Sequence, residues 1–175
     1  SGTGKEASEE LTNQIDAFSK GREINPSVYA KPIAFNALPQ CGDFEENRYT
    51  EEENKLVKET HKILDTSIEV AATCVRIPVY NGHSESVHIK TAKALTEESI
   101  LKVLRDAPGL SVKYGDAAVD YPTALTDGDG KELVQVGRIR KDLWSDNRLN
   151  IWVVADNLLK GAALNSIQIA ELIFE

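Results

Sequence analysis

The fold class is decided by two runs of β-branched and apolar residues, "ELVQVGRIR" (Glu132–Arg140) and "LNIWVVAD" (Leu149–Asp156). Val, Ile and aromatic residues are enriched in strands, so both runs predict strands. The same composition predicts strands over "LSVKY" (Leu110–Tyr114), Glu85–Lys90 and Ile68–Tyr80. Because these strands gather into one sheet with helices on one face, and do not alternate singly with helices, the pattern indicates an α+β fold.

Helices are expected in four places around these strands. They cover Ala7–Phe18, the stretch from Thr50 to Leu64, the stretch from Thr96 to Pro108, and about 157–174. Thr50 and Glu53 have the spacing of a capping box, and Asp156 can cap the last helix, whose apolar residues predict burial on much of its surface. The arm Arg22–Cys41 holds three prolines and must be extended or looped. A length of 175 residues suggests that 1–175 is one domain.

Composition restricts the partners and the location of the protein. A net charge of −8 and a pI of about 5.0 argue against binding to nucleic acid or to an anionic membrane surface. No apolar run approaches the roughly 20 residues that span a bilayer, so a cytoplasmic protein is expected. "TDGDGKE" (Thr126–Glu132) imitates the start of a calcium loop but lacks its later ligands. We therefore expect a hairpin turn there and no metal site.

The two cysteines, Cys41 and Cys74, form neither a disulfide framework nor a CxxC pattern, so both are expected to be reduced thiols. Cys74 lies two residues before Arg76, and on a strand these side chains share one face, which would lower the pKa of the thiol. A strand cysteine is more often a small buried hydrophobe, and we favour that interpretation.

The stretch "VRIPVYNGHSES" (Val75–Ser86) places an arginine and a histidine around one turn. His83 follows Gly82 at the end of a strand, where an imidazole can act as general acid or base, although a solvated histidine is the alternative. His61 and His88 lie on polar faces and are expected to be solvated. The guanidinium of Arg76 is a preferred fork for a carboxylate or a phosphate.

Glu52 and Lys55 lie three residues apart in the first turn of the second helix, so their side chains face the same way. One interpretation is a surface ion pair of little energetic weight. The other is a carboxylate and an ammonium group presented together to a ligand at a helix N-terminus. The residues alone leave both interpretations open.

Several motifs in a fixed order resemble one enzyme family. They are "SGTGKEASEEL", "IAFNALPQ", "YTEEENKLVKETHKIL", "TCVRIPVYNGHSES", "VGRIRKDL" and "WVVADNLLKGAALNSIQIAE". Over essentially its whole length the sequence is similar to the catalytic and dimerisation half of bacterial aspartate-semialdehyde dehydrogenases. The resemblance implies an α+β fold with a mixed β-sheet, similar to the C-terminal domain of glyceraldehyde-phosphate dehydrogenases, and a homodimer. It also implies that NADPH reduces aspartyl-β-phosphate to aspartate-β-semialdehyde with release of phosphate, in the pathway to lysine, threonine, methionine and diaminopimelate.

The resemblance also implies roles for individual residues. His83 matches the acid/base histidine of the family, and Arg76 matches the arginine that binds the substrate carboxylate. Glu52 matches a glutamate near the substrate amino group, and Lys55 matches a lysine at the phosphate site. The residues expected beside NADP are Ser1, Gly2, Gly4 and Asn165.

The sequence also departs from the family pattern. The nucleophilic cysteine of the family lies in an Asn-Cys-(Ser/Thr) motif before "SGxG", and neither Cys41 nor Cys74 matches it. The N-terminal nucleotide-binding domain of the family has no counterpart in the 175 residues. The helix at about 157–174 is expected to pack toward that domain. We therefore expect a piece of a longer enzyme that is inactive alone. The alternatives are a non-catalytic dimerisation module and a related N-acetylglutamyl-phosphate reductase, against which "TCVRIPV" followed by "HSES" argues.

Overall fold

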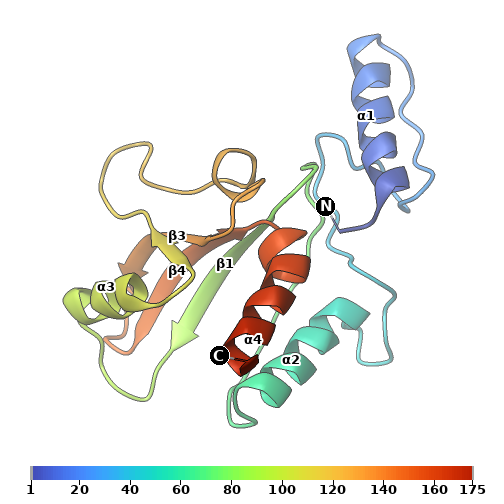
Figure 1. Cartoon of the computed structure of the whole chain (residues 1–175). Helices are drawn as coiled ribbons and strands as arrows, with labels where there is room; N and C mark the ends of the chain where they lie inside the picture. The colour runs from blue at the N-terminus through green and yellow to red at the C-terminus, as the bar shows by residue number, and fades with distance from the viewer. Residues whose placement is uncertain (1, 175) are drawn as a thin grey trace. The chain divides into compact units, whose positions relative to one another are not determined.

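The computed structural model describes residues 2–174, which form two compact units. The first unit holds Thr3–Pro78. The second holds Gly2 and the residues from Val79 onward. Most of the helices and strands of both units are labelled in Figure 1, and each unit is described by itself.

The first unit is built on two helices joined by the proline-rich arm. Helix α1 covers Lys5–Ser19 and helix α2 covers Glu51–Ile63, as the sequence predicts. A small apolar cluster joins α1 to the arm; its buried members are Leu11, Ile33, Ala34 and Leu38, and Tyr29 packs against them. The arm is looped throughout, because its prolines exclude a helix.

Two buried polar side chains of α1 bind the backbone of the arm. Glu10 accepts hydrogen bonds from the backbone N–H (2.9 Å) and hydroxyl (2.7 Å) of Ser27, and from the N–H of Val28. Gln14 Oε1 accepts from the N–H groups of Ile33 (2.9 Å) and Ala34 (3.0 Å). A loop has no ladder to satisfy its backbone donors, so these side chains take the place of one.

Helix α2 starts at the predicted capping box. The Thr50 side chain accepts from the Glu53 N–H, and the Glu53 carboxylate accepts from the Thr50 N–H at 2.8 Å. Both side chains are buried. This reciprocal pair satisfies two donors that a helix N-terminus otherwise leaves without partners.

The strand predicted over Ile68–Tyr80 is wrong. Within the described chain this stretch forms one isolated antiparallel bridge, Leu38↔Arg76, and is otherwise extended without a ladder. Exposed Val75 and Ile77 alternate with half-buried Cys74 and Arg76, as they would on a strand. β-propensity describes residues that suit a pleated surface, but it does not supply a partner strand. Here the described part of the arm supplies one bridging residue, Leu38.

The second unit contains a mixed sheet of four strands in the order β1-β4-β3-β2, which confirms the predicted fold class. The strands are β1 (His83–Lys90), β2 (Leu110–Val112), β3 (Val134–Lys141) and β4 (Arg148–Ala155). β4 pairs antiparallel with β1 and β3, whereas β2 and β3 are parallel. The strands predicted from the sequence near these four positions are therefore confirmed.

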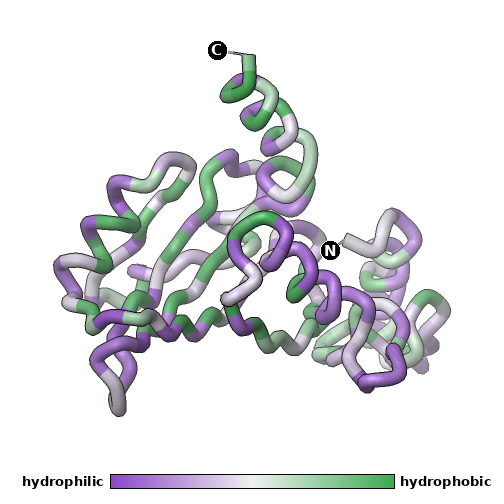
Figure 2. The backbone as a smooth tube through the Cα atoms, turned by 90° about the horizontal axis from the view of Figure 1, so that it is seen from below, coloured by the Kyte–Doolittle hydropathy of each residue, from purple (hydrophilic) through white to green (hydrophobic). Residues whose placement is uncertain are grey.

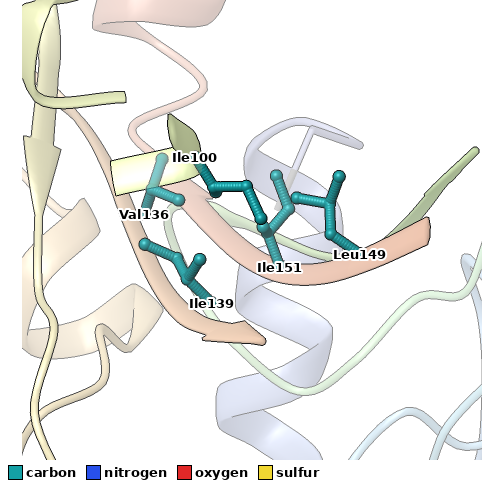
Figure 3. Close-up of a cluster of buried hydrophobic side chains, with 5 residues drawn as sticks. All are labelled: Ile100, Val136, Ile139, Leu149 and Ile151. Atoms are coloured by element: carbon teal, nitrogen blue, oxygen red, sulfur yellow. The ribbon is translucent and has the colours of Figure 1, made fainter. Parts of the chain in front are cut away.

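Helix α3 (Glu97–Asp106) covers one face of this sheet. Its Ile100 packs with Val136, Ile139, Leu149 and Ile151 in a buried cluster, shown in Figure 3. The helix begins with a capping box between Thr96 and Ser99, and Thr96 is the predicted cap. His88 alternates with Val87 and Ile89 on β1, is exposed as predicted, and bonds Asn150 on the neighbouring strand β4 at 3.1 Å.

The hairpin predicted at "TDGDGKE" is wrong. The chain between β2 and β3 contains a π-helical turn at Ala124–Gly128 followed by a tight turn. Because β2 and β3 are parallel, a two-residue hairpin cannot connect them, and the connection must cross over. The Asp-Gly pairs therefore lie in a crossover connection.

The C-terminal helix α4 (Leu164–Phe174) follows a π-helical turn at Leu159–Ala163. Asp156 accepts hydrogen bonds from the N–H groups of Leu158 (2.7 Å) and Leu159 (3.0 Å), so it caps this region as predicted. The expected burial of α4 is not found, because none of its described residues is buried. Figure 2 shows hydrophobic residues along this helix up to its end, and Leu172 is 80% exposed. No described element packs onto this apolar surface, so it remains exposed in this chain.

Among the described residues no helix is long and apolar enough to span a bilayer.

Candidate functional site

Arg76 is held by the arm at its backbone and at its side chain. Its N–H and C=O exchange hydrogen bonds of 2.8 and 2.9 Å with Leu38. Its guanidinium carbon lies 5.7 Å from the centroid of the Tyr29 ring, within the range of a cation–π contact. Sequence reasoning found Arg76 but missed Tyr29, because an aromatic residue in a proline-rich loop gives no periodic signal.

Glu52 and Lys55 form an ion pair on the first turn of α2, as their spacing predicts. Lys55 Nζ lies 3.2 Å from Glu52 Oε1, and about half of each side chain is exposed. The hydrogen bond to Glu52 raises the pKa of Lys55, so the ammonium stays charged near neutrality. The pair therefore presents one charge of each sign to solvent.

Glu53 joins the start of α2 to the segment that carries Arg76. While Oε2 completes the capping box, Oε1 accepts from the N–H of Cys74 at 2.8 Å. Hydrogen bonds from the backbones of Thr50 and Cys74 lower the pKa of this carboxyl below its usual value. The capping box was predictable from the sequence, but the second contact was not, since Cys74 lies 21 residues away.

Cys41 lies in the same neighbourhood. Burial raises the pKa of its thiol; Arg76 opposes that effect, while Glu52 and Glu53 add to it. The net shift is upward, so the thiolate is disfavoured. Cys74 and Arg76 are both half-buried and alternate with exposed residues, although the extended segment that carries them is not a strand.

His83 is the exposed first residue of β1, where it pairs with Ala155. It thus belongs to the sheet, although the sequence assigned it to the connecting turn. Gly2 is its close neighbour: a Cβ at Gly2 would lie 3.7 Å from His83 Nε2. The imidazole therefore faces a backbone segment without a side chain.

The turn before His83 is fixed by contacts with distant residues. Gly82 has a φ of +86°, and a Cβ there would lie 3.2 Å from the Cβ of Ala124. Its N–H donates to Asn157 Oδ1 at 2.8 Å. The adjacent Asp156 carboxylate accepts from the Gly130 N–H at 2.8 Å. Only glycine suits this crowded left-handed position, so the predicted Asn-Gly turn has a specific structural cause.

The remaining predicted residues lie as follows. Gly4 precedes α1 with a φ of 94°, and Asn165 is half-buried in the first turn of α4. Ser1 lies outside the described residues. In the first unit, Arg76 and Glu52 both lie close enough to Cys41 to affect the pKa of its thiol, and Lys55 is paired with Glu52. In the second unit, Gly2 lies beside His83. In residues 2–174 no three His, Cys, Asp or Glu side chains group in a way that could hold a metal ion.

These groups allow a limited set of chemical tasks. A guanidinium binds a carboxylate or phosphate, and an adjacent carboxylate and ammonium bind groups of opposite charge. An exposed imidazole beside a bare backbone can exchange a proton with a bound molecule. No activated thiolate accompanies them at Cys41.

Comparison with known proteins gives consistent matches. The model of the family described as "Semialdehyde dehydrogenase, dimerisation domain" matches residues 1–160. An aspartate-semialdehyde dehydrogenase from a Shewanella species is 50% identical over 174 residues, covering 99% of this chain and 51% of that protein. One from Legionella pneumophila is 49% identical over 174 residues, covering 99% and 50%.

Among solved structures, aspartate semialdehyde dehydrogenase II from Vibrio cholerae, described as complexed with ASA, has a TM-score of 0.93 at 43% identity. The match covers 98% of this chain and 51% of that one. The chain therefore spans about half the length of the relatives that it matches.

Proposed function

The chain belongs to the semialdehyde dehydrogenase dimerisation-domain family, and from that premise we propose that it is the substrate-binding and dimerisation half of an aspartate-semialdehyde dehydrogenase. The complete enzyme would reduce aspartyl-β-phosphate to aspartate-β-semialdehyde and release phosphate. The proposal rests on one observation: Arg76 and the Glu52–Lys55 ion pair lie near the same thiol, that of Cys41. It is supported by the 50% sequence identity to an aspartate-semialdehyde dehydrogenase.

Each side chain in that group suits one part of the substrate. Arg76 would bind the α-carboxylate, since guanidinium and carboxylate form paired hydrogen bonds. Glu52 would bind the amino group and Lys55 the phosphate, and the charge of each is the one that its task needs. The ion pair between them would keep both in place until substrate binds.

His83 would act as general acid or base beside the reacting carbon, giving or taking the proton of the oxygen bound to it. Its exposed position at the start of β1 gives a substrate access to the ring. NADP, when bound, would supply or accept the hydride. The fit of its nicotinamide end is supported by Gly2, whose missing side chain leaves space facing His83 Nε2, while Gly4 and Asn165 are proposed to complete that side.

The other half of the complete enzyme would supply the nucleophilic cysteine and most of the NADP site. The exposed apolar residues of α4 support a contact with such a domain; they include Ile167, Ile169, Leu172, Ile173 and Phe174. The family description supports assembly as a homodimer. For this chain in isolation, the length of the match favours a module that dimerises but does not catalyse.

The proposal is tested by phosphate-dependent NADP reduction with aspartate semialdehyde. The samples are this chain alone, the complete enzyme that contains it, and that enzyme with His83→Ala. We expect activity only in the complete enzyme, with kcat lowered about 100- to 10,000-fold by His83→Ala. N-acetylglutamate semialdehyde is the matched control substrate, and faster turnover of it would contradict the proposed substrate. Activity of this chain alone would mean that Cys41 or Cys74 is the nucleophile.

A further inference from the structure

We propose that Tyr29 is a positioning residue for Arg76, and that Glu10 and Gln14 fix the arm that carries it. The inference rests on the proposed function only in assigning the substrate carboxylate to Arg76. It concerns three residues to which neither the sequence motifs nor the relatives' names give a role.

The contact between the two side chains is direct. The Arg76 guanidinium carbon lies over the Tyr29 ring at 5.7 Å from its centroid. The face of an aromatic ring attracts a cation, and the flat guanidinium group can stack on it. An arginine side chain has many rotamers, and a ring on one side of the guanidinium reduces the number that it can adopt.

Tyr29 is itself held from several directions within the first unit. Its hydroxyl donates to Thr3 Oγ1 at 3.0 Å, and its ring packs against the cluster around Leu11 and Leu38. The ring is therefore a fixed surface, which a freely rotating aromatic side chain on a loop would not be.

The arm is fixed on both sides of Tyr29. Just before it, Glu10 accepts three hydrogen bonds from Ser27 and Val28. After it, Gln14 Oε1 accepts from two backbone N–H groups. The Gln14 amide also donates to Glu10 Oε1 at 2.8 Å, so the two α1 residues support each other. Both are almost fully buried, at 5% and 3% exposure.

The same arm reaches the backbone of Arg76 through Leu38. One segment therefore restrains both ends of the arginine, the backbone by the Leu38 bridge and the guanidinium by the Tyr29 ring. The Leu38 bridge restrains the backbone of Arg76, and the Tyr29 ring adds a second restraint at the guanidinium.

The test uses the complete enzyme and the KM for aspartate semialdehyde. Tyr29→Leu should raise KM about three- to five-fold, the size of an exposed cation–π contact, with kcat changed less than about two-fold. Tyr29→Phe keeps the ring and should stay within about two-fold of the parent KM. Phe35→Leu replaces another aromatic residue of the arm, one that is exposed and packs against Phe18 with tilted rings, and should leave KM unchanged.

A double-mutant cycle tests whether Tyr29 changes KM through Arg76. Arg76→Ala should raise KM by itself, and adding Tyr29→Leu should then have no further effect. Thermal melting checks that each variant is folded, and Tyr29→Met replaces Tyr29→Leu if the latter does not fold.

The outcomes that would overturn the inference are distinct. If Arg76→Ala raises KM but Tyr29→Leu does not, the positioning role is wrong and the proposed function stands. The role is also wrong if Tyr29→Phe matches Tyr29→Leu, or if Tyr29→Leu acts equally without Arg76. If Arg76→Ala leaves KM unchanged, the substrate role proposed for Arg76 fails and the inference fails with it.

Discussion

Arg76 and His83 lie seven residues apart in the sequence but are held in place by different means. His83 opens an eight-residue strand that pairs with β4 from His83↔Ala155 to Lys90↔Arg148. Arg76 lies on an extended segment with one bridge, to Leu38, and otherwise depends on contacts such as those of Tyr29 and Glu53. One position is fixed by a backbone ladder, and the other by individual side chains. The two should therefore fail in response to different kinds of mutation.

The largest effect on stability is expected where a single side chain replaces a ladder. Glu10→Ala removes the acceptor for the Ser27 and Val28 N–H groups and should lower the free energy of unfolding by roughly 2–4 kcal/mol. Urea denaturation of this chain measures it. The matched control is Glu9→Ala on the next residue of α1, an exposed partner of Lys5 at 3.5 Å, which should change stability by less than about 0.5 kcal/mol. Equal effects of the two variants would show that the arm does not depend on Glu10.

A backbone mutation should instead affect the His83 side. Gly82→Ala forces a left-handed residue against Ala124 and should cost roughly 1–3 kcal/mol. Gly130→Ala is the control, because its φ is also positive, at +70°, but no atom lies within 4 Å of the added Cβ. Denaturation curves should show a larger loss for Gly82→Ala. If the two losses were equal, conformational strain alone would explain them and the contact with Ala124 would be unimportant.

Low pH should reduce the stability of the protein, because it protonates the Glu10 carboxylate that binds the arm. Burial raises the pKa of Glu10, but the hydrogen bonds from Val28 and Ser27 outweigh it, so the pKa lies below its usual 4.5. A carboxyl with a lowered folded-state pKa contributes stability above the unfolded pKa, and that contribution is lost as pH falls through the folded value. The stability of the parent chain should therefore fall as pH drops below about 4.5.

The carboxamide variant isolates this contribution, because Glu10→Gln cannot titrate. Its stability should depend less steeply on pH below 4.5 than that of the parent. Parallel slopes in the two proteins would assign the acid sensitivity to other carboxyl groups, such as Glu53 or Asp127, whose pKa is lowered to about 2 by its bond to Lys113.

The smallest effect on stability is expected at the Glu52–Lys55 pair. Lys55→Ala should change the free energy of unfolding by less than about 0.5 kcal/mol, because a half-exposed ion pair is screened by solvent. In the complete enzyme the same variant should nevertheless raise the KM for phosphate. An unchanged KM for phosphate would favour the other interpretation, a surface ion pair of little energetic weight, and a large loss of stability would contradict both.

Local patterns explain which parts of this protein were predictable. The capping box at Thr50 depends on a residue three positions away, so the sequence shows it directly. β3 and β4 are recognisable from their own residues. The stretch Ile68–Tyr80 has a similar composition, but within residues 2–174 its ladder pairing is a single bridge to Leu38.

The residues of the candidate site also divide into those that the sequence predicts and those that it does not. Arg76, His83 and the Glu52–Lys55 pair follow from motif and spacing. The support from Tyr29 and Glu10 does not, because each acts on residues that the chain brings close only after folding, such as Glu10 on Ser27 over 17 positions. For α4, the apolar composition indicates that its surface needs a partner but not where the partner lies, and in this chain none of its described residues is buried.

The hydrogen bond from Gly82 to Asn157 spans 75 positions along the chain. It determines when each part of the site can form during synthesis. Thr3–Pro78 is one continuous segment, so the surroundings of Arg76 can fold as soon as that segment has left the ribosome. The turn before His83 must wait until β4 and Asn157 have been translated, and pairings over such distances form slowly. His83 is therefore the later of the two residues to reach its final position.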